Sequence, residues 1–359
     1  MEEIIGHRRA VERLARVAAQ QAPAHAYLFV GPPHVGKRTV ARWFARALVC
    51  EGDGPAPCGR CRACGLVHAG RHPDVRAVDL EAQRHLLGEK RPSAVYKVEL
   101  VRRLQADWAI RPLEAPWKVL IVERADRMTP QAANAFLKTL EEPPPFVVLI
   151  LTALDEENLL PTIRSRCQLV RLRPVPAGEI EVALRGRGAD AEEARRLARL
   201  SGGRVGWAIR ALDEPAVVAA YQEAVELLER LLRATRSERL QEAERLARRP
   251  DGLDILAWWL TWWRDMWLRH HGVADALGLP SPQGLQEAAG RLSPLAVYWI
   301  VRRVERSARI LEETNVNPEL VWDTVVLGLP RLGDGGRARK ANRGRGERLA
   351  GREMRAPGD

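Results

Sequence analysis

Four of the five cysteines lie close together, at a spacing that suits a metal ion. They are Cys50, Cys58, Cys61 and Cys64, and they include two overlapping C-x2-C steps. Such steps place thiolates on one tight turn, which Cys50 can close into the tetrahedron that structural zinc prefers. Because four protein ligands leave no coordination position open, the spacing predicts an architectural zinc. A redox or iron–sulfur site and an empty loop are the alternatives.

A glycine-rich stretch from Gly31 to Lys37 has the spacing of a phosphate-binding loop. It follows a strand-like run and opens a helical one, so backbone N–H groups and the lysine would meet phosphate oxygens. The next position normally gives Mg²⁺ a hydroxyl, and here it is Arg38. Thr39 lies roughly 100° further round the helix and is a poor substitute. Gly31, Gly36, Lys37 and Thr39 are the predicted contacts of a degenerate ATP or ADP site, with a turn that binds nothing as the alternative.

A second departure from an ATPase follows the apolar run 119–122. The acidic pair expected there is replaced by Glu123-Arg124. Glu123 can still hold a metal through water, but Arg124 stands where a carboxylate would activate the attacking water. A guanidinium cannot accept that proton, since its pKa lies above about 12. The two defects together predict that the chain does not hydrolyse ATP by itself.

These residues fall on alternating strand-like and helical runs between residues 1 and 172. Helical spacing occupies 10–19 and 40–49. The strand candidates are 26–30, 75–78, 119–122, 147–151 and 168–172. Such alternation predicts an α/β domain with a mostly parallel sheet.

Strand candidates disappear after residue 172. Short helices are expected over 177–212, and 216–331 is almost wholly helical in pattern. From Gly333 onward the chain is rich in Gly and Arg, with eight Lys/Arg against four Asp/Glu. Such a tail cannot bury enough apolar surface to fold, so we expect it to be disordered.

Composition is that of a soluble globular protein, with 46% hydrophobic and 29% charged residues among 359. No apolar run approaches the roughly 18 residues needed to cross a bilayer, and the N-terminus has no signal-peptide pattern. We therefore expect a cytosolic protein without a membrane partner. The net charge of +11 and pI near 10 suit contact with a polyanion, although an arginine-rich proteome alone would give the same excess.

Taken together, the motifs resemble the delta-prime subunits of the bacterial DNA polymerase III clamp loader, in the AAA+ family. The resemblance extends from Ile4 to about Leu332. Besides the phosphate loop and the cysteine module it rests on Ile5-Gly-His7, His25-Ala-Tyr-Leu28, Asn134-Ala-Phe-Leu-Lys-Thr-Leu-Glu-Glu-Pro143, Ser165-Arg166-Cys167 and Asn315-Val-Asn-Pro318. The ordered set is far more specific than any one of its motifs.

The resemblance implies an architecture with three folded parts. An AAA+ domain with a parallel sheet is expected over 1–172, with the zinc module at 50–64. A small helical lid would follow over 173–213, and an all-α collar that joins subunits in a ring over 214–332. Residues 333–359 would be the basic tail.

The resemblance also implies a role in DNA replication, within a complex that loads the sliding clamp onto primed DNA. Arg166 matches the family's arginine finger, which enters the ATP site of a neighbouring subunit. The implied partners are the tau/gamma and delta subunits, the sliding clamp and, through the assembled complex, primed DNA. The chain would then be a component of the DNA polymerase III holoenzyme, a nucleotidyltransferase complex, without ATPase activity of its own.

The tau/gamma motor subunit is the closest alternative, because it shares the zinc module and the Ser-Arg-Cys segment. Gly206 stands where the motor's sensor arginine is expected, and Arg204 is two positions away. Thr152 is near the position of the polar sensor, which Ala153 occupies. These differences favour delta-prime over an active ATPase. A different AAA+ adaptor in DNA repair is a third possibility.

Two further sets of residues have structural and functional interpretations. Five tryptophans recur on one helical face, at Trp258, Trp259, Trp262, Trp263 and Trp267. A helix packed against other helices explains them better than stacking on nucleic-acid bases. His68 and His72 follow the cysteines and are candidates for contacts around the metal site.

Overall fold

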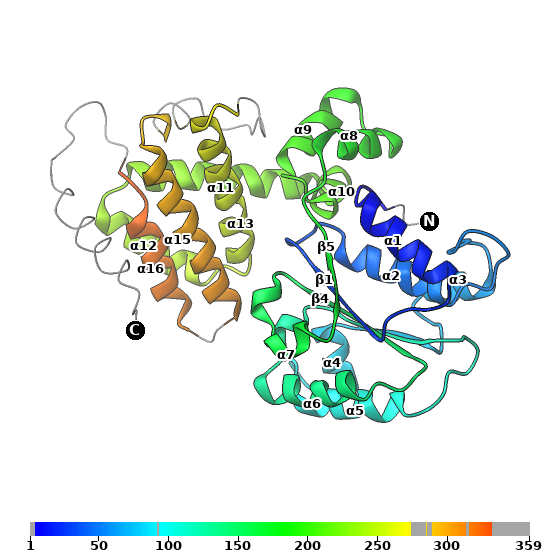
Figure 1. Ribbon diagram of the computed structural model, residues 1–359. Coiled ribbons are helices and arrows are strands. Elements are labelled where there is room, and N and C mark those ends of the chain that lie inside the picture. The colour runs from blue at the N-terminus through cyan, green and yellow to red at the C-terminus, as the bar shows by residue number, and fades with distance from the viewer. Residues whose placement is uncertain (1–3, 92, 274–284, 286–288, 314–315, 332–359) are drawn as a thin grey trace, which may run out of the picture. The chain divides into compact units, whose positions relative to one another are not determined.

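The computed structural model describes residues 4–331, apart from 92, 274–284, 286–288 and 314–315 (Figure 1). Its residues form two compact units: the first contains the residues up to Gln222 together with Gly272 and Val273, and the second contains Glu223–His271 and the described residues from Leu285 onward. Asn315 of the Asn-Val-Asn-Pro segment and the predicted tail over 333–359 lie outside the described residues.

A five-stranded parallel sheet is the centre of the first unit, in the order β2-β3-β4-β1-β5. Its strands are β1 (Ala26–Val30), β2 (Val75–Val78), β3 (Lys118–Val122), β4 (Val147–Ala153) and β5 (Gln168–Arg171). Strands β1 and β4 are buried along their whole length, as expected where helices cover both faces. The prediction of five strands in a parallel sheet is confirmed, with ends that differ by at most two residues.

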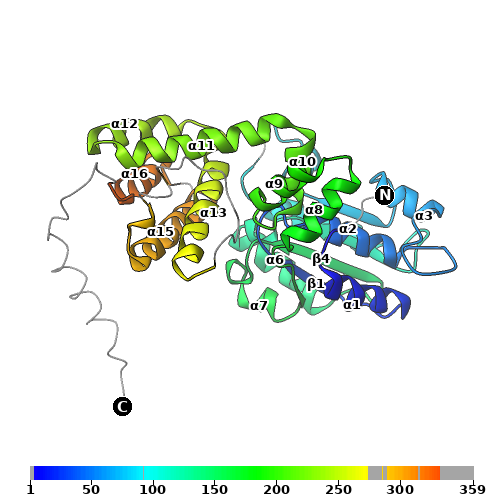
Figure 2. The same cartoon turned by 90° about the horizontal axis from the view of Figure 1, so that it is seen from above.

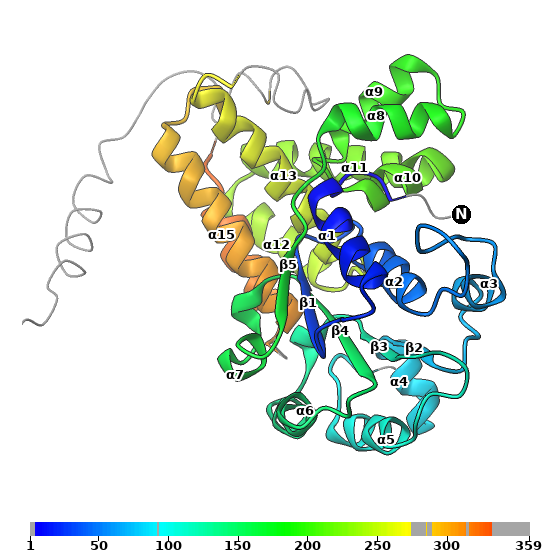
Figure 3. The same cartoon turned by 45° about the vertical axis from the view of Figure 1, so that its right-hand side comes forward.

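Helices cover the two faces of this sheet in two groups, which Figure 3 shows on opposite sides of the strands. One face packs against α1 (Arg8–Ala19), α2 (Lys37–Leu48) and α3 (Arg62–His68). The other face packs against α5 (Val98–Trp108) and α6 (Pro130–Glu141), with α4 (Leu80–Leu87) beside them. The short α7 (Pro161–Arg164) and two 3-10 turns, η1 (Ala125–Arg127) and η2 (Glu156–Asn158), connect the later strands.

Three short helices follow the last strand, as the sequence predicts. They are α8 (Ala177–Gly186), α9 (Ala191–Leu200) and α10 (Val205–Asp213). Gly203 turns the chain between α9 and α10 with a φ of +83°, and a Cβ there would lie 2.5 Å from the Cβ of Pro174. Only glycine therefore lets this turn pack against the segment that leaves the sheet.

The second unit is helical, and its helices lie side by side in Figure 2. They are α12 (Arg236–Ala247), α13 (Gly252–His270), α15 (Pro294–Glu313) and α16 (Pro318–Gly328), together with the end of α11 (Pro215–Arg233). Within the described residues, no helix is both long and apolar enough to cross a membrane.

The tryptophans of α13 form the core of this second unit. Trp258, Trp259, Trp262 and Trp263 are buried, and the Trp259 indole N–H donates to the Ala224 carbonyl oxygen at 2.7 Å. The prediction of a helix packed against its neighbours is confirmed for these residues, and burial excludes them from stacking on nucleic-acid bases.

Candidate functional site

The chemistry-bearing residues meet at one edge of the sheet, because the carboxyl ends of parallel strands point the same way. The phosphate loop follows β1, Asp79 follows β2, and Glu123 follows β3. Thr152 lies near the end of β4, between β1 and β3 in the sheet. The sequence placed the loop and Glu123 at this edge, and the structure adds Asp79.

The phosphate loop wraps closely round its lysine. Gly36 has a φ of +105° and stands directly before α2, a conformation that favours glycine. A Cβ on Gly31 would lie 2.2 Å from the Leu172 carbonyl oxygen. The Lys37 side chain is 8% exposed, and its ammonium donates to the carbonyl oxygens of Gly31 (2.6 Å) and Pro32 (2.8 Å).

Arg38 lies between the two carboxylates of this edge. Its Nε atom is 2.8 Å from Oε1 of Glu123, and one of its terminal nitrogens is 3.9 Å from Oδ2 of Asp79. Burial raises the pKa of Glu123, and the neighbouring arginine charge opposes that rise. The guanidinium is therefore a cation at the place where the motif normally holds Mg²⁺.

Arg124 has a different partner. Its guanidinium is 2.9 Å from the buried carboxylate of Asp126, while its backbone N–H donates to the Thr152 hydroxyl at 3.0 Å. Thr152 is itself buried in β4. The residue at the water-activating position is thus a cation held by an ion pair, and it supplies no proton acceptor.

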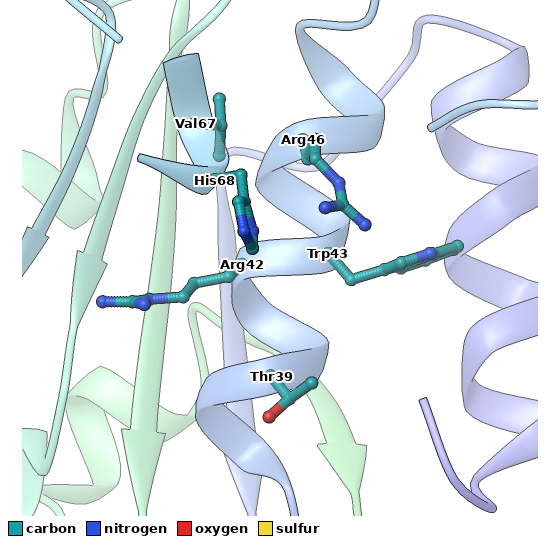
Figure 4. Close-up of a pocket in the computed structure, with 6 residues that line it drawn as sticks. All are labelled: Thr39, Arg42, Trp43, Arg46, Val67 and His68. Atoms are coloured by element: carbon teal, nitrogen blue, oxygen red, sulfur yellow. The ribbon is translucent and has the colours of Figure 1, made fainter. Parts of the chain in front are cut away.

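Thr39 points to another part of the surface. It lines a hollow between α2 and α3, together with Arg42, Trp43, Arg46, Val67 and His68 (Figure 4). In this view the guanidinium groups of Arg42 and Arg46 point to opposite sides of α2. The hollow therefore does not bring its charges together on one ligand, and Thr39 is not placed beside Glu123.

The start of α10 is attached to the phosphate loop by a backbone hydrogen bond. The N–H of Gly206 donates to the His34 carbonyl oxygen at 2.8 Å, and a Cβ on Gly206 would lie 3.2 Å from that oxygen. Arg204 is buried, donates to the Ser201 carbonyl oxygen at 2.8 Å and lies over the Trp207 ring. Gly206, which stands where a sensor arginine is expected, therefore makes a close backbone contact with His34.

Arg166 lies just before β5, at the end of the segment that contains α7. Its Nη2 atom is 2.9 Å from Oε1 of Glu141, and Nη1 donates to the Thr162 carbonyl oxygen at 3.1 Å. Glu141 belongs to the Leu-Glu-Glu-Pro motif at the end of α6. The two motifs that the sequence singles out are thus in contact, and 35% of the Arg166 side chain is exposed to solvent.

The four cysteine sulfurs form one cluster after α2. All four Sγ atoms lie within 4.8 Å of one another, and those of Cys50 and Cys61 are 4.0 Å apart. Zinc–sulfur bonds of about 2.3 Å would hold tetrahedral sulfurs roughly 3.8 Å apart, so the cluster fits zinc with a small contraction. Backbone N–H groups of Cys58, Cys61 and Cys64 each donate to a cluster sulfur, as thiolates require.

Protonation within the cluster also suits a bound cation. Backbone N–H donors lower the pKa of Cys58 to about 6, whereas burial raises the pKa of Cys64. A metal ion removes this conflict because it stabilises all four thiolates. Nδ1 of His72 accepts the backbone N–H of Asp74 at 3.1 Å. His68 lines the hollow on α2.

The chain is similar to a family model and to individual protein sequences. The family model described as "DNA polymerase III, delta subunit" matches residues 6–176. The DNA polymerase III subunit delta-prime of Pseudomonas aeruginosa is 31% identical over 317 residues, which cover 85% of this chain and 91% of the relative. The chain belongs to the DNA polymerase III delta-prime family. As a delta-prime protein it has a clamp-loader role in DNA replication.

A second delta-prime relative gives the same result. The Escherichia coli subunit is 30% identical over 316 residues, covering 87% of this chain and 91% of the relative. The likeness to tau/gamma proteins is shorter. The Haemophilus influenzae tau/gamma subunit is 31% identical over 179 residues, which are 50% of this chain and 24% of that protein. These two delta-prime relatives therefore match most of the chain, and the tau/gamma relative matches half of it.

Three ion-pair partners in this delta-prime chain were missed by the sequence analysis. They are Asp79, Asp126 and Glu141. Asp79 directly follows a strand candidate, so the rule that located Glu123 would also have found it. The pairing of Asp126 and Glu141 with arginines has no such signal, because it depends on side-chain directions.

Proposed function

We propose that this chain is a delta-prime subunit that does not hydrolyse ATP and supplies Arg166 to the ATP site of a neighbouring subunit. The observation that carries the proposal is the ion pair between Arg38 and Glu123. Hydrolysis in this class of site needs Mg²⁺ held by a hydroxyl and a carboxylate, and a residue that orients the attacking water. Arg38 replaces the hydroxyl that would hold Mg²⁺, and Arg124 replaces the residue that would orient the attacking water.

The role of Arg166 is supported by its position and exposure. It follows a buried anchor, Ile163, on a segment held to α6 through Glu141. A guanidinium fixed in this way can stabilise the charge that develops on a γ-phosphate of another chain, and it needs no proton acceptor to do so. The finger explains how a subunit without catalysis of its own contributes to ATP turnover.

The remaining architecture fits an AAA+ subunit of such a complex. We infer that 1–172 is the nucleotide-binding-like domain, 173–213 the lid and 214–332 the collar, with 333–359 as a basic tail. Zinc at Cys50, Cys58, Cys61 and Cys64 would be architectural and leave no position for a substrate.

The inferred partners are the tau/gamma and delta subunits, the sliding clamp and primed DNA. Assembly with these partners would take place in the cytoplasm. Native mass spectrometry of the chain mixed with tau/gamma and delta subunits tests the assembly, and a chain that joins no complex would contradict it. Direct metal analysis of the same sample tests the zinc.

ATP turnover by the purified chain tests the loss of hydrolysis. We expect the rate to equal that of a Lys37→Ala variant, because neither protein can assemble a metal-bound γ-phosphate. Turnover clearly above this control would instead support an active ATPase of the tau/gamma type, the alternative that the 31% identity to tau/gamma over half of the chain favours.

A further inference from the structure

Arg38 removes the hydroxyl expected at this position, and it also brings a positive charge into the site. Its Nε atom is 2.8 Å from the Glu123 carboxylate, and its guanidinium also approaches Asp79 at 3.9 Å. Both carboxylates follow strands of the sheet, and Arg38 is the second residue of α2. One cation therefore joins the phosphate loop to the two acidic residues at the edge of the sheet.

A divalent metal at this place would need the same carboxylates. In a working phosphate-loop site, Mg²⁺ is held by the Ser or Thr after the lysine and by an acidic residue of the third strand, and it neutralises the β- and γ-phosphates. Here the hydroxyl is absent and Glu123 already has a cationic partner. Mg²⁺ would have to break that ion pair, with no oxygen at position 38 to compensate.

Arg38 can also do part of what the metal does. A guanidinium has five N–H donors in a fixed plane and binds phosphate through two of them at once. The Arg38 side chain is 51% exposed, so it can meet a phosphate in the loop without leaving Glu123. Lys37 adds a second positive charge from the same end of α2.

We propose that Arg38 replaces the divalent cation of this site, so that the loop binds a nucleoside diphosphate or triphosphate in its metal-free form. This inference deepens the proposed function and rests on it, since a site without Mg²⁺ cannot hydrolyse ATP efficiently. It adds a ligand specificity: the chain distinguishes free ADP or ATP from the Mg²⁺ complexes that its neighbours bind.

The test compares binding of ADP to the full-length chain in EDTA and in excess Mg²⁺, by titration calorimetry. For the wild type we expect ADP to bind in EDTA and excess Mg²⁺ to weaken the apparent binding about tenfold or more, because Mg²⁺ withdraws the free nucleotide. For Arg38→Ser, which offers the metal a hydroxyl and leaves Glu123 unpaired, we expect Mg²⁺ to tighten ADP binding about tenfold or more. Arg16→Ser, which removes an exposed arginine of α1, is the control and should behave as the wild type.

A second measurement follows the metal itself. With ADP and excess Mn²⁺ in place of Mg²⁺, adding the wild type should not change the electron paramagnetic resonance signal of the Mn²⁺–ADP mixture, and adding Arg38→Ser should change it clearly. Absence of ADP binding to the wild type in EDTA, or binding that requires Mg²⁺, would overturn the inference. Neither result would affect the proposed lack of hydrolysis, which ATP turnover alone decides.

Discussion

At the scale of single residues, three arginines define what this chain can and cannot do. Arg38 pairs with Glu123, Arg124 pairs with Asp126, and Arg166 is held by Glu141. The first two place positive charge inside the chain's own site. The third lies two residues after the end of α7, and 35% of its side chain is exposed to solvent.

The contact between Glu141 and Arg166 gives a prediction about positioning. Glu141→Gln removes the charge partner but keeps the shape, so the arginine loses a fixed direction. We expect hydrolysis by the reconstituted complex to fall several-fold, while the stability of the chain changes by less than about 1 kcal/mol, because the ion pair is exposed. The measurements are ATP turnover of the complex and urea unfolding of the isolated chain.

The adjacent Glu142→Gln is the control for that variant. It removes the same charge from the same motif and should leave turnover at the wild-type rate. Equal losses from both variants would show that net charge, and not the hold on Arg166, is responsible.

Sequence could single out these arginines but not their partners. Arg38 and Arg124 occupy positions that the phosphate-loop and acidic motifs define, so their types alone reveal the defects. That Arg38 turns toward Glu123, and that Arg124 turns to Asp126, depends on side-chain directions set by the folded sheet edge. Thr39 illustrates the same limit, since its place on the hollow beside α3 follows from helix packing.

At the scale of elements, the geometry of the cysteine loop depends on Gly52. This glycine does not have a left-handed backbone conformation, so the reason for it is steric. A Cβ on Gly52 would lie 2.6 Å from Sγ and 2.9 Å from Cβ of Cys58. We expect Gly52→Ala to push this sulfur out of the cluster and weaken zinc binding about tenfold or more. Competition for the metal with a zinc-binding dye measures the change.

Gly65 provides a matched control within the same module. It lies in α3, and a Cβ there would have no neighbour within 4 Å. Gly65→Ala should keep the wild-type zinc affinity and can add about 0.5–1 kcal/mol of stability, as alanine does in helices. Loss of zinc in both variants would contradict the steric explanation.

Asp74 connects the start of β2 to the segment before β3. Its buried carboxylate accepts backbone N–H bonds from Leu113 (2.7 Å), Glu114 (2.8 Å) and Ala115 (3.0 Å). Burial alone would raise the pKa of Asp74, but these three donors outweigh it and lower the pKa. The ionised carboxylate is therefore a stabilising element of this side of the sheet.

This shift predicts a pH dependence for unfolding. A carboxylate with a lowered folded pKa stabilises the protein above its unfolded pKa of about 3.9, and this stabilisation is lost as the pH falls through the folded pKa. We expect Asp74→Asn to cost about 1–3 kcal/mol at pH 7, because an amide satisfies the donors less well. The difference from the wild type should shrink below about pH 4 in urea titrations; a difference independent of pH would contradict it.

At the scale of the whole molecule, alternation of patterns was sufficient to predict the first unit. Five strands and the switch to helices after residue 172 follow from hydrophobic spacing, because each buried strand is a short apolar run between turn signals. The spacing of the tryptophans on one face of α13 likewise predicted that their side chains are buried. The order of the strands and the attachment of Gly206 to His34 did not follow from spacing, because both depend on contacts between distant segments.

The two units differ in what they contain, and their separate contributions can be measured only in the assembled complex. The first unit contains the phosphate loop, the four-cysteine cluster and Arg166, while the second is helical with an aromatic core. We propose that the chain does not hydrolyse ATP by itself. Its contribution must be measured through its neighbour.

The most direct measurement is single-turnover ATP hydrolysis by a complex reconstituted with Arg166→Ala, with assembly verified by native mass spectrometry. We predict that hydrolysis at the site facing this chain falls by about 10³-fold or more, the range expected for an arginine finger, while the complex assembles normally. Arg164→Ala, two residues earlier on the same segment, should leave hydrolysis unchanged. Undiminished hydrolysis at every site of an intact Arg166→Ala complex would contradict the transfer of this arginine to a neighbour.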